Sequence, residues 1–412
     1  QATSAWFHAH IVAPLGLTRV PNPPQLWIMG FVGIAAGLIS RGRFLVESGA
    51  AEGGTIVQVI SYFEFLCFAP LLIPLIPAML PANQAGTRRP FGDPTWVLLY
   101  LPVLATYAIA INSRGSMVEG IVAVLIVASF LVLSDQAQLK REHRGLVLVS
   151  VLIALFAAPV VKDLSTAMLI ARSARATDST PELVDRTWEA FQDKRALREF
   201  ELILQAARGS GFQDEHYIAN PFLNRLVVVK YIDNTLHPEG IRNGDFRDEI
   251  ARFTVNKTLA ALPAPALRML GSDLDKDEWK FSFGDLVVTL EYGVYLGGYK
   301  LGSVVSNVFA LFGMLSFLVV VPLNLLAFTV LQSLIGKRGS LIVISPALVF
   351  QTYVIFHLYA IGSLPSILGL VARGIPQTVA IYLLIFWLTY PLTRGRGHAQ
   401  KPAAAPQGSL AS

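Results

Sequence analysis

The chain has 412 residues, of which 53% are hydrophobic and 15% charged, and its formal net charge is +5. A soluble globular protein carries about a quarter charged residues, so this composition excludes a soluble enzyme as well as a fibrous or disordered chain. The chain has 33 basic and 28 acidic residues, and 39 of these charged residues lie between Lys162 and Lys300, so the charges are unevenly spread. The sequence therefore predicts a membrane-embedded protein with a water-exposed insert.

Apolar runs of the length needed to cross a membrane, about 20 residues, recur along the chain. Eight runs approach that length, at residues 25–40, 55–80, 95–111, 117–133, 145–161, 304–334, 341–361 and 377–392. The second and sixth are long enough to tilt or break, with Pro70, Pro74, Pro77 and Pro322 as candidate kink points. We therefore expect an all-α polytopic membrane protein with about eight or more transmembrane helices.

Basic residues in the short loops indicate the orientation, because such residues favour the cytoplasmic side. With the C-terminal tail inside, three further clusters also fall inside: Lys337 and Arg338; Lys140, Arg141 and Arg144; Arg88 and Arg89. Arg41, Arg43 and Arg114 fall outside as exceptions. Most of the basic excess therefore serves orientation, and we expect no nucleic-acid partner.

The same alternation places the insert outside and divides the chain into four parts. These are the N-terminal transmembrane helices (1–161), an extracytoplasmic or periplasmic loop domain (162–300), the C-terminal transmembrane helices (301–393) and a disordered cytoplasmic tail (394–412). The residues before the first run show no signal-peptide pattern, and the chain begins at Gln1, so we expect an N-terminal part to be missing.

The insert carries several helix signals. The segment Ser179-Thr180-Pro181-Glu182 is typical of a helix start, and an amphipathic pattern continues to Gly209. A second start at Asn220-Pro221 leads to Leu236, although its β-branched residues 227–229 also suit a strand. Residues 245–262 predict a third helix, and residues 284–299 lead back toward the membrane. The extracytoplasmic insert is therefore expected to be mainly helical.

Familiar cofactor motifs are absent from the sequence. It has no Walker-type loop, no dinucleotide glycine fingerprint and no His-Glu-x-x-His, and its single cysteine, Cys67, excludes a multi-cysteine metal site. We expect neither a cofactor nor a metal.

The turn Ser113-Arg114-Gly115 joins the third and fourth apolar runs at their outer ends. A helix N-terminus offers unpaired N–H groups, Gly115 permits close backbone approach, and the Arg114 guanidinium is a bidentate phosphate donor. These features suit a lipid-linked pyrophosphate, and the alternative is an ordinary interfacial arginine in a turn.

A second group of candidates is Arg225, Lys230 and Asp233 in the insert. If residues 220–236 are helical, Arg225 and Asp233 lie two turns apart on one face. An arginine there can stabilise a departing phosphate, and a carboxylate of raised pKa can act as a base. The alternative is a solvated or paired helix face.

Further acidic candidates lie in or beside apolar segments. Glu64 falls inside the second run, where a charge needs a protein partner or a cavity. Glu119 opens the fourth run near Arg114, where a local ion pair is the simplest role. Asp285 and Glu291 are alternative bases near the end of the insert.

The Ser113-Arg114-Gly115 turn opening an apolar run, the large outer insert, and Arg225 followed by Lys230 and Asp233 together resemble the O-antigen polymerase and O-antigen ligase superfamily of bacterial membrane glycosyltransferases. The similarity is greatest to its exopolysaccharide or capsule polymerase branch and covers residues 95–335. The resemblance implies that Arg114 matches the arginine of the family turn and Arg225 the functional arginine of the outer loop. The ligase branch has a histidine late in that loop where this chain offers Asp285, which disfavours a ligase.

The resemblance further implies a metal-independent transfer of a glycan from undecaprenyl pyrophosphate to an acceptor sugar hydroxyl at the periplasmic face of the bacterial inner membrane. Arg225 and either Asp233 or Asp285 are then the expected catalytic groups, and Ser113, Arg114, Gly115 and Lys230 the pyrophosphate ligands. The expected partners are the lipid-linked oligosaccharide donor and acceptor, membrane lipids, and polysaccharide export or chain-length proteins. The competing hypotheses are a transporter or flippase for lipid-linked saccharides and a non-catalytic scaffold.

Overall fold

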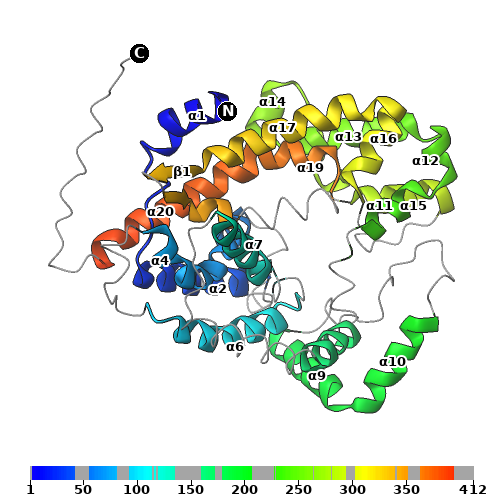
Figure 1. Cartoon of the computed structure of the whole chain (residues 1–412). Helices are drawn as coiled ribbons and strands as arrows, with labels where there is room; N and C mark the ends of the chain where they lie inside the picture. The colour runs from blue at the N-terminus through cyan, green and yellow to red at the C-terminus, as the bar shows by residue number, and fades with distance from the viewer. Residues whose placement is uncertain are drawn as a thin grey trace.

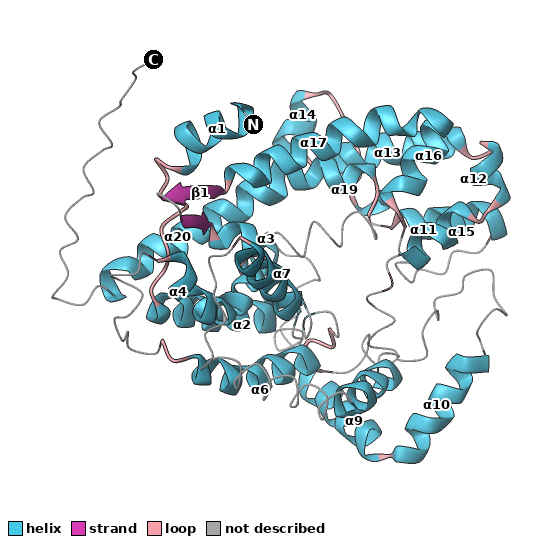
Figure 2. Cartoon of the chain, viewed as in Figure 1, coloured by secondary structure: helices cyan, strands magenta, loops and turns pink. Residues whose placement is uncertain are grey.

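A computed structural model describes most of the chain as helix (Figure 2). The described residues are 2–41, 55–80, 92–113, 116, 119–134, 159–171, 179–206, 227, 229–262, 264–279, 281–293, 302–338, 341–350 and 362–393.

Helices account for all described elements before the insert: α1 (Ala2–Phe7), η1 (His8–Val12), α2 (Pro23–Arg41), α3 (Thr55–Ser61), η3 (Glu64–Leu75), α4 (Ile76–Met79), α6 (Pro94–Ala110) and α7 (Glu119–Leu133). Residues 159–170 are also helical. The insert contains α9 (Thr180–Gln192), α10 (Lys194–Ala206), α11 (Val229–Leu236), α12 (Glu239–Asn243), α13 (Arg247–Ala260), α14 (Ala264–Met269), η7 (Asp277–Trp279) and α15 (Phe283–Tyr292). The C-terminal part contains α16 (Val304–Phe312), η8 (Gly313–Ser316), α17 (Phe317–Ser333), β1 (Ile335–Arg338), β2 (Leu341–Ile344), α19 (Leu364–Gly369), η9 (Leu370–Gly374) and α20 (Ile375–Thr393).

Four helices in the described part of the chain are long and apolar enough to cross a membrane, namely Pro23–Ser40, Val59–Met79, Val304–Ser333 and Leu364–Thr393. Two shorter apolar helices, Thr95–Ala110 and Glu119–Leu133, match the third and fourth runs. Large apolar side chains along α17, among them Phe317, Leu325 and Phe328, are exposed as in a lipid-facing helix. These features are those of an all-α membrane protein, but the described residues do not reach the expected count of eight spans.

The seventh apolar run is not helical at its start. Leu341–Ile344 forms strand β2, which pairs antiparallel with β1 so that Ile335 lies opposite Ile344. The expectation of a helix beginning at Leu341 is therefore wrong for these four residues. Three consecutive β-branched residues end the strand, and such residues favour a pleated conformation over a helical one. Residues 351–361 of this run lie outside the described part.

The sixth run breaks, but not at the expected proline. Pro322 lies within the continuous helix α17, whereas the break falls at Gly313, between α16 and α17. Gly313 has a φ of +55°, a backbone conformation that L side chains rarely adopt. A glycine with positive φ ends the helical hydrogen-bond pattern more abruptly here than the proline does.

The second run bends where its prolines remove hydrogen-bond donors. Glu64–Leu75 is a 3₁₀ helix containing Pro70 and Pro74, which have no N–H to donate. In a 3₁₀ helix the Cys67 carbonyl would pair with the N–H of residue 70, which is proline. The Tyr100 hydroxyl donates to that carbonyl instead, at 2.8 Å. The expected break in this span is confirmed.

Three glycines let α2 pack directly on η3 and α6. A Cβ at Gly33 would lie 2.0 Å from the backbone N of Cys67, and a Cβ at Gly37 would lie 1.9 Å from the Tyr107 hydroxyl. Gly30 faces Pro70 in the same way. Small residues at such spacing allow close helix packing within a membrane.

The spans have two opposite ends, which we call the hairpin end and the insert end (Figure 1). At the hairpin end, near β1 and β2, Asn22 Nδ2 donates to Thr393 Oγ1 at 3.1 Å and His8 Nδ1 lies 2.9 Å from the Ser333 carbonyl. This places the start of α2 beside the end of α20, as the predicted alternation requires, and η1 beside the end of α17. At the opposite end α16 and α19 meet the insert.

The insert packs on helix α16. Ile250 and Phe253 of α13 form a core with Phe283 and Val287 of α15 and Ala310 of α16. Helix α15 ends at Gly293 and belongs to this core, so residues 284–292 are part of the insert and not of a span.

Buried hydrogen bonds join the insert to the same spans. Asn307 Nδ2 of α16 donates to Thr254 Oγ1 of α13 at 3.3 Å, and Asn307 Oδ1 accepts from the Leu364 N–H of α19 at 2.9 Å. The side chain of Asn307 is fully buried. One residue therefore connects the insert and two C-terminal spans.

Local signals predicted two insert helices well. Helix α9 begins at the expected start, where Ser179 and Glu182 form a capping box, and α13 lies within the predicted range 245–262. The amphipathic pattern toward Gly209 is interrupted, because Asp193 Oδ1 accepts from the N–H groups of Arg195 and Ala196, each at 3.0 Å, and starts a new helix, α10.

Candidate functional site

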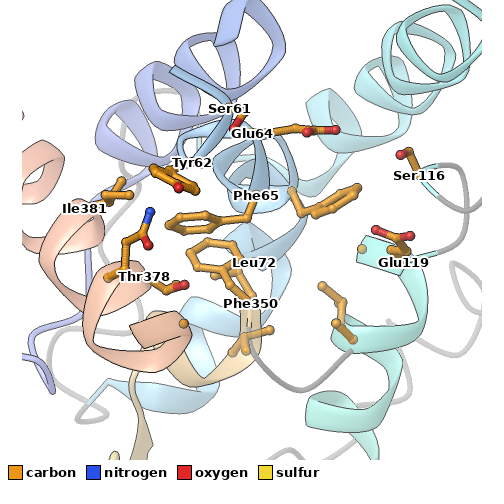
Figure 3. Close-up of a pocket in the computed structure, with 17 residues that line it drawn as sticks. Ser61, Tyr62, Glu64, Phe65, Leu72, Ser116, Glu119, Phe350, Thr378 and Ile381 are labelled. Carbon is orange, nitrogen blue, oxygen red and sulfur yellow. The ribbon is translucent and has the colours of Figure 1, made fainter. Parts of the chain in front are cut away.

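A cavity of about 360 Å³ lies between η3, α7 and α20. Seventeen residues line it: Ser61, Tyr62, Glu64, Phe65, Phe68, Leu72, Ser116, Glu119, Gly120, Ala123, Val124, Val349, Phe350, Gly374, Gln377, Thr378 and Ile381. Figure 3 shows Glu64, Ser116 and Glu119 on one side and Tyr62, Thr378 and Ile381 on the other. The polar lining residues lie in or just before the first turns of η3, α7 and α20, so the cavity lies toward the insert end.

Glu64 is held at the first turn of η3. Its Oε1 accepts a hydrogen bond from the Tyr107 hydroxyl of α6 at 2.9 Å. The absence of a side chain at Gly37 makes room for that hydroxyl. A carboxylate in an apolar span requires such a polar environment, and the cavity and Tyr107 supply it.

The predicted Ser113-Arg114-Gly115 turn begins beside this cavity. Asn112, with a φ of +46°, ends α6, and the Ser116 hydroxyl donates to the Ser113 hydroxyl at 2.9 Å. Ser116 itself lines the cavity. Arg114 and Gly115 lie outside the described residues.

Glu119 opens α7 a few residues after that turn and is the second acid of the cavity lining. Gly120 follows it at a point of close contact, where a Cβ would lie 2.2 Å from the Phe68 ring. The sequence named Glu64 and Glu119 separately, and the fold brings both to one cavity. Their convergence was not predicted, because it depends on the packing of η3 against α7.

Arg373 lies at the edge of the cavity and was not predicted as a functional residue. It belongs to the π-helix η9. Arg373 contacts Tyr62 and Gln377 and directly precedes Gly374, and all three of these residues line the cavity. Its Nη2 donates to the Tyr62 hydroxyl, and its Nε donates to Gln377 Oε1 at 3.3 Å. A signal was available: Arg373 is the single charged residue between the last two apolar runs, at ends expected to lie outside.

Two of the insert candidates lie on helix α11. Lys230 is buried, with its Nζ 4.9 Å from the centre of the Tyr231 ring, whereas Asp233 is exposed. Neither residue lines the cavity as described. Arg225, expected on the same helical face as Asp233, lies outside the described residues.

Asp285 caps helix α15. Its Oδ2 accepts from the Ser282 hydroxyl at 2.9 Å and from the Ser282 N–H at 3.3 Å, while the Asp285 N–H donates to the Ser282 hydroxyl at 3.0 Å. The side chain is 2% exposed. A reciprocal capping box accounts for this carboxylate structurally, and to act as a base it would have to leave the cap.

Lys257 lies beside Asp285 under the insert core. Its Nζ donates to the carbonyl oxygens of Trp279 and Phe281 at 2.5 and 2.6 Å. Burial lowers the pKa of Lys257 from its ordinary value, and the nearby Asp285 charge opposes that shift. Lys257 belongs to the insert and does not line the cavity.

No protein-family model, curated protein or solved structure matches the chain.

Proposed function

We propose that the chain is a bacterial polysaccharide polymerase that transfers a glycan from a lipid pyrophosphate to an acceptor sugar hydroxyl, without a metal or nucleotide. The observation that supports this most is the cavity at the insert end, where Glu64 and Glu119 meet the start of the Ser113-Arg114-Gly115 turn. The resemblance to O-antigen and exopolysaccharide polymerases supplies the reaction.

The lining of the cavity suits a sugar. Aromatic rings such as Tyr62, Phe65 and Phe68 pack against the apolar face of a pyranose ring, while Glu119 and Gln377 exchange hydrogen bonds with its hydroxyls. Its volume of about 360 Å³ lies within the range of roughly 300–1,000 Å³ found for small-molecule sites. One or two sugar units of a longer chain fit such a space.

The proposed reaction is a single displacement at the anomeric carbon. The acceptor hydroxyl oxygen forms the new glycosidic bond, the anomeric C–O bond to the pyrophosphate breaks, and a carboxylate takes the hydroxyl proton. Glu64 and Glu119 now join Asp233 and Asp285 as candidates for that base, and the cavity favours the first pair. Arg114 and Arg225 stabilise the departing pyrophosphate charge.

The setting follows the same proposal. The insert end faces the periplasm, the hairpin end with Lys337 and Arg338 faces the cytoplasm, and the protein resides in the inner membrane with eight or more spans. Its partners are the lipid-linked donor and acceptor, membrane lipids, and polysaccharide export or chain-length proteins.

Measuring the length of the polysaccharide made in cells tests this proposal. In a strain lacking its own copy, we expect Arg114→Ala to abolish long chains on polysaccharide gels while the protein level stays normal. Arg268→Ala, an exposed arginine of α14, is the matched control and should leave chain length unchanged. Normal long chains in the Arg114→Ala strain would contradict the assignment.

A transporter of lipid-linked saccharides is the second candidate, favoured by one observation. The span containing Glu64 is broken by the 3₁₀ helix η3, and transporters bind substrates at broken helices. An assay of purified protein in detergent separates the two, since detergent leaves no second compartment and only a polymerase lengthens the glycan there.

A further inference from the structure

Arg373 carries a positive charge held by neutral groups. Its guanidinium donates to the Tyr62 hydroxyl, to Gln377 Oε1 at 3.3 Å and, more weakly, to the Ala261 carbonyl of the insert at 3.5 Å. A guanidinium has five N–H donors, so two remain without a partner among the described residues. In this part of the chain no carboxylate neutralises Arg373, and its side chain is exposed at the cavity edge.

The backbone around Arg373 is unusual for a reason that the sequence explains. Residues Leu370–Gly374 form a π-helix directly before Pro376, which has no N–H for the carbonyl four residues earlier. The helix widens there, and π-helical turns are rare and often occur at functional sites. Arg373 lies against Tyr62, just before η3, whose ring centre is 5.4 Å from the guanidinium carbon.

We infer that Arg373, together with Tyr62 and Gln377, forms a phosphate subsite at the mouth of the cavity, which takes the pyrophosphate of a polyprenyl-linked sugar. The inference rests on the proposed function for its substrate class. In such a lipid the sugar and the pyrophosphate are directly bonded. A sugar in the cavity therefore brings its phosphate to the edge, where Arg373 offers one remaining N–H donor on Nη1 and one on Nη2.

The charges around the site fit this order of groups. Glu64 and Glu119 line the cavity, where they would repel a phosphate and accept from sugar hydroxyls. Arg373 lies at the edge nearest the insert, which it contacts through Ala261. The cavity thus has two acids in its lining and a basic residue beside it, an arrangement that suits a sugar pyrophosphate.

The test measures binding without turnover. The full chain, purified in detergent, is titrated calorimetrically with farnesyl pyrophosphate, a short polyprenyl pyrophosphate. We expect Arg373→Gln to weaken binding by roughly tenfold to a hundredfold, the loss of a charge-assisted hydrogen bond to phosphate. Arg373→Lys keeps the charge but loses the planar arrangement of donors, so its affinity should lie between those of the wild type and Arg373→Gln.

Two controls separate binding from folding. Arg252→Gln removes an exposed arginine of α13 that does not line the cavity, and it should bind as the wild type does. The melting temperature of Arg373→Gln in detergent is the second control, and it should stay close to that of the wild type. If the melting temperature of Arg373→Gln falls together with its binding, Arg373 acts only as a structural tether and the inference fails.

Further outcomes also overturn the inference. They are no binding of farnesyl pyrophosphate by the wild type, equal binding by wild type and Arg373→Gln, and equally effective competition by phosphatidylglycerol, which would assign the site to ordinary lipid head groups. A chain that binds through Arg373 but extends no glycan would refute the proposed function and leave this subsite standing. A chain that extends the glycan, yet binds farnesyl pyrophosphate equally well after Arg373→Gln, would refute this subsite and leave the proposed function standing.

Discussion

Lys257 shows how a single buried cation can report on the insert. Its ammonium group satisfies the Trp279 and Phe281 carbonyls, and burial lowers its pKa. The charged form is therefore less favourable in the folded insert than in the unfolded chain, where the pKa of lysine is about 10.4.

Stability should consequently depend on pH through this residue. Between the lowered folded pKa and the unfolded value the unfolded chain binds more protons, so the free energy of unfolding rises with pH. We expect the melting temperature of the wild type, relative to Lys257→Met, to increase as the pH is raised from 7 toward 10. A difference that stays constant or falls would show that Lys257 is not destabilised by burial.

The two acids of the cavity give a prediction about the reaction. A general base contributes about 10²- to 10⁴-fold to the rate, so either Glu64→Gln or Glu119→Gln should lower glycan extension by that factor. Glu189→Gln, an exposed acid on α9, should have no effect. Extension at wild-type rate by both cavity variants would return the role of base to Asp233 or Asp285.

At the residue scale, the sequence identified Ser113, Glu64 and Glu119 because a charge or a helix-opening turn beside an apolar run is visible in one dimension. Arg373 escaped notice because its importance comes from contacts with Tyr62 and Ala261, which are far away in sequence. The buried capping role of Asp285 was visible in principle, since Ser282 precedes it by three residues.

Among the elements, the contact of α2 with η3 depends on glycine. A Cβ at Gly33 would meet the backbone of η3 at 2.0 Å, and backbone cannot move as a side chain can. We expect Gly33→Ala to lower the melting temperature, or the yield of folded protein, and to disturb the cavity that η3 lines.

A matched glycine provides the control. Gly369 of α19 has no atom within 4 Å of where its Cβ would lie. Gly369→Ala should therefore be neutral or slightly stabilising, by up to about 1 kcal/mol, because alanine favours helix over glycine. Equal behaviour of the two variants would mean that α2 and η3 do not pack as described.

The junction of α13, α16 and α19 yields a second prediction at this scale. Asn307→Ala leaves the buried Leu364 N–H and Thr254 hydroxyl without a partner, at a cost of about 1–3 kcal/mol for each unsatisfied group. Asn324→Ala, in α17, removes only a local bond to the Val320 carbonyl and should lower the unfolding temperature less. The reverse order would contradict the described junction.

Local chemistry predicted elements well where the signal was contained within one turn. The Ser179 capping box and the break at Pro70 and Pro74 depend on neighbouring residues alone. The strand at Leu341–Ile344 was not predicted, because a strand needs a partner strand and its apolar residues are equally typical of the start of a transmembrane helix. The break at Gly313 was not predicted, because hydropathy gives no information about a positive φ.

Over the whole molecule, the uneven distribution of charge predicts a division into membrane helices and insert, and this division stays a prediction. The alternation of basic loops also agrees with the described fold, which groups Asn22, Ser333 and Thr393 at one end. The cavity could not be predicted, because it forms where helices from three distant segments converge. Its polar groups nevertheless lie at the end to which the sequence assigned the outer charges.

Extension of a lipid-linked oligosaccharide by the purified full chain in detergent tests the central claim most directly. The account predicts longer glycans on the lipid carrier, released polyprenyl pyrophosphate, and loss of both products in Arg114→Ala. A well-folded wild-type chain that leaves the glycan unchanged, when both donor and acceptor are supplied, would contradict it.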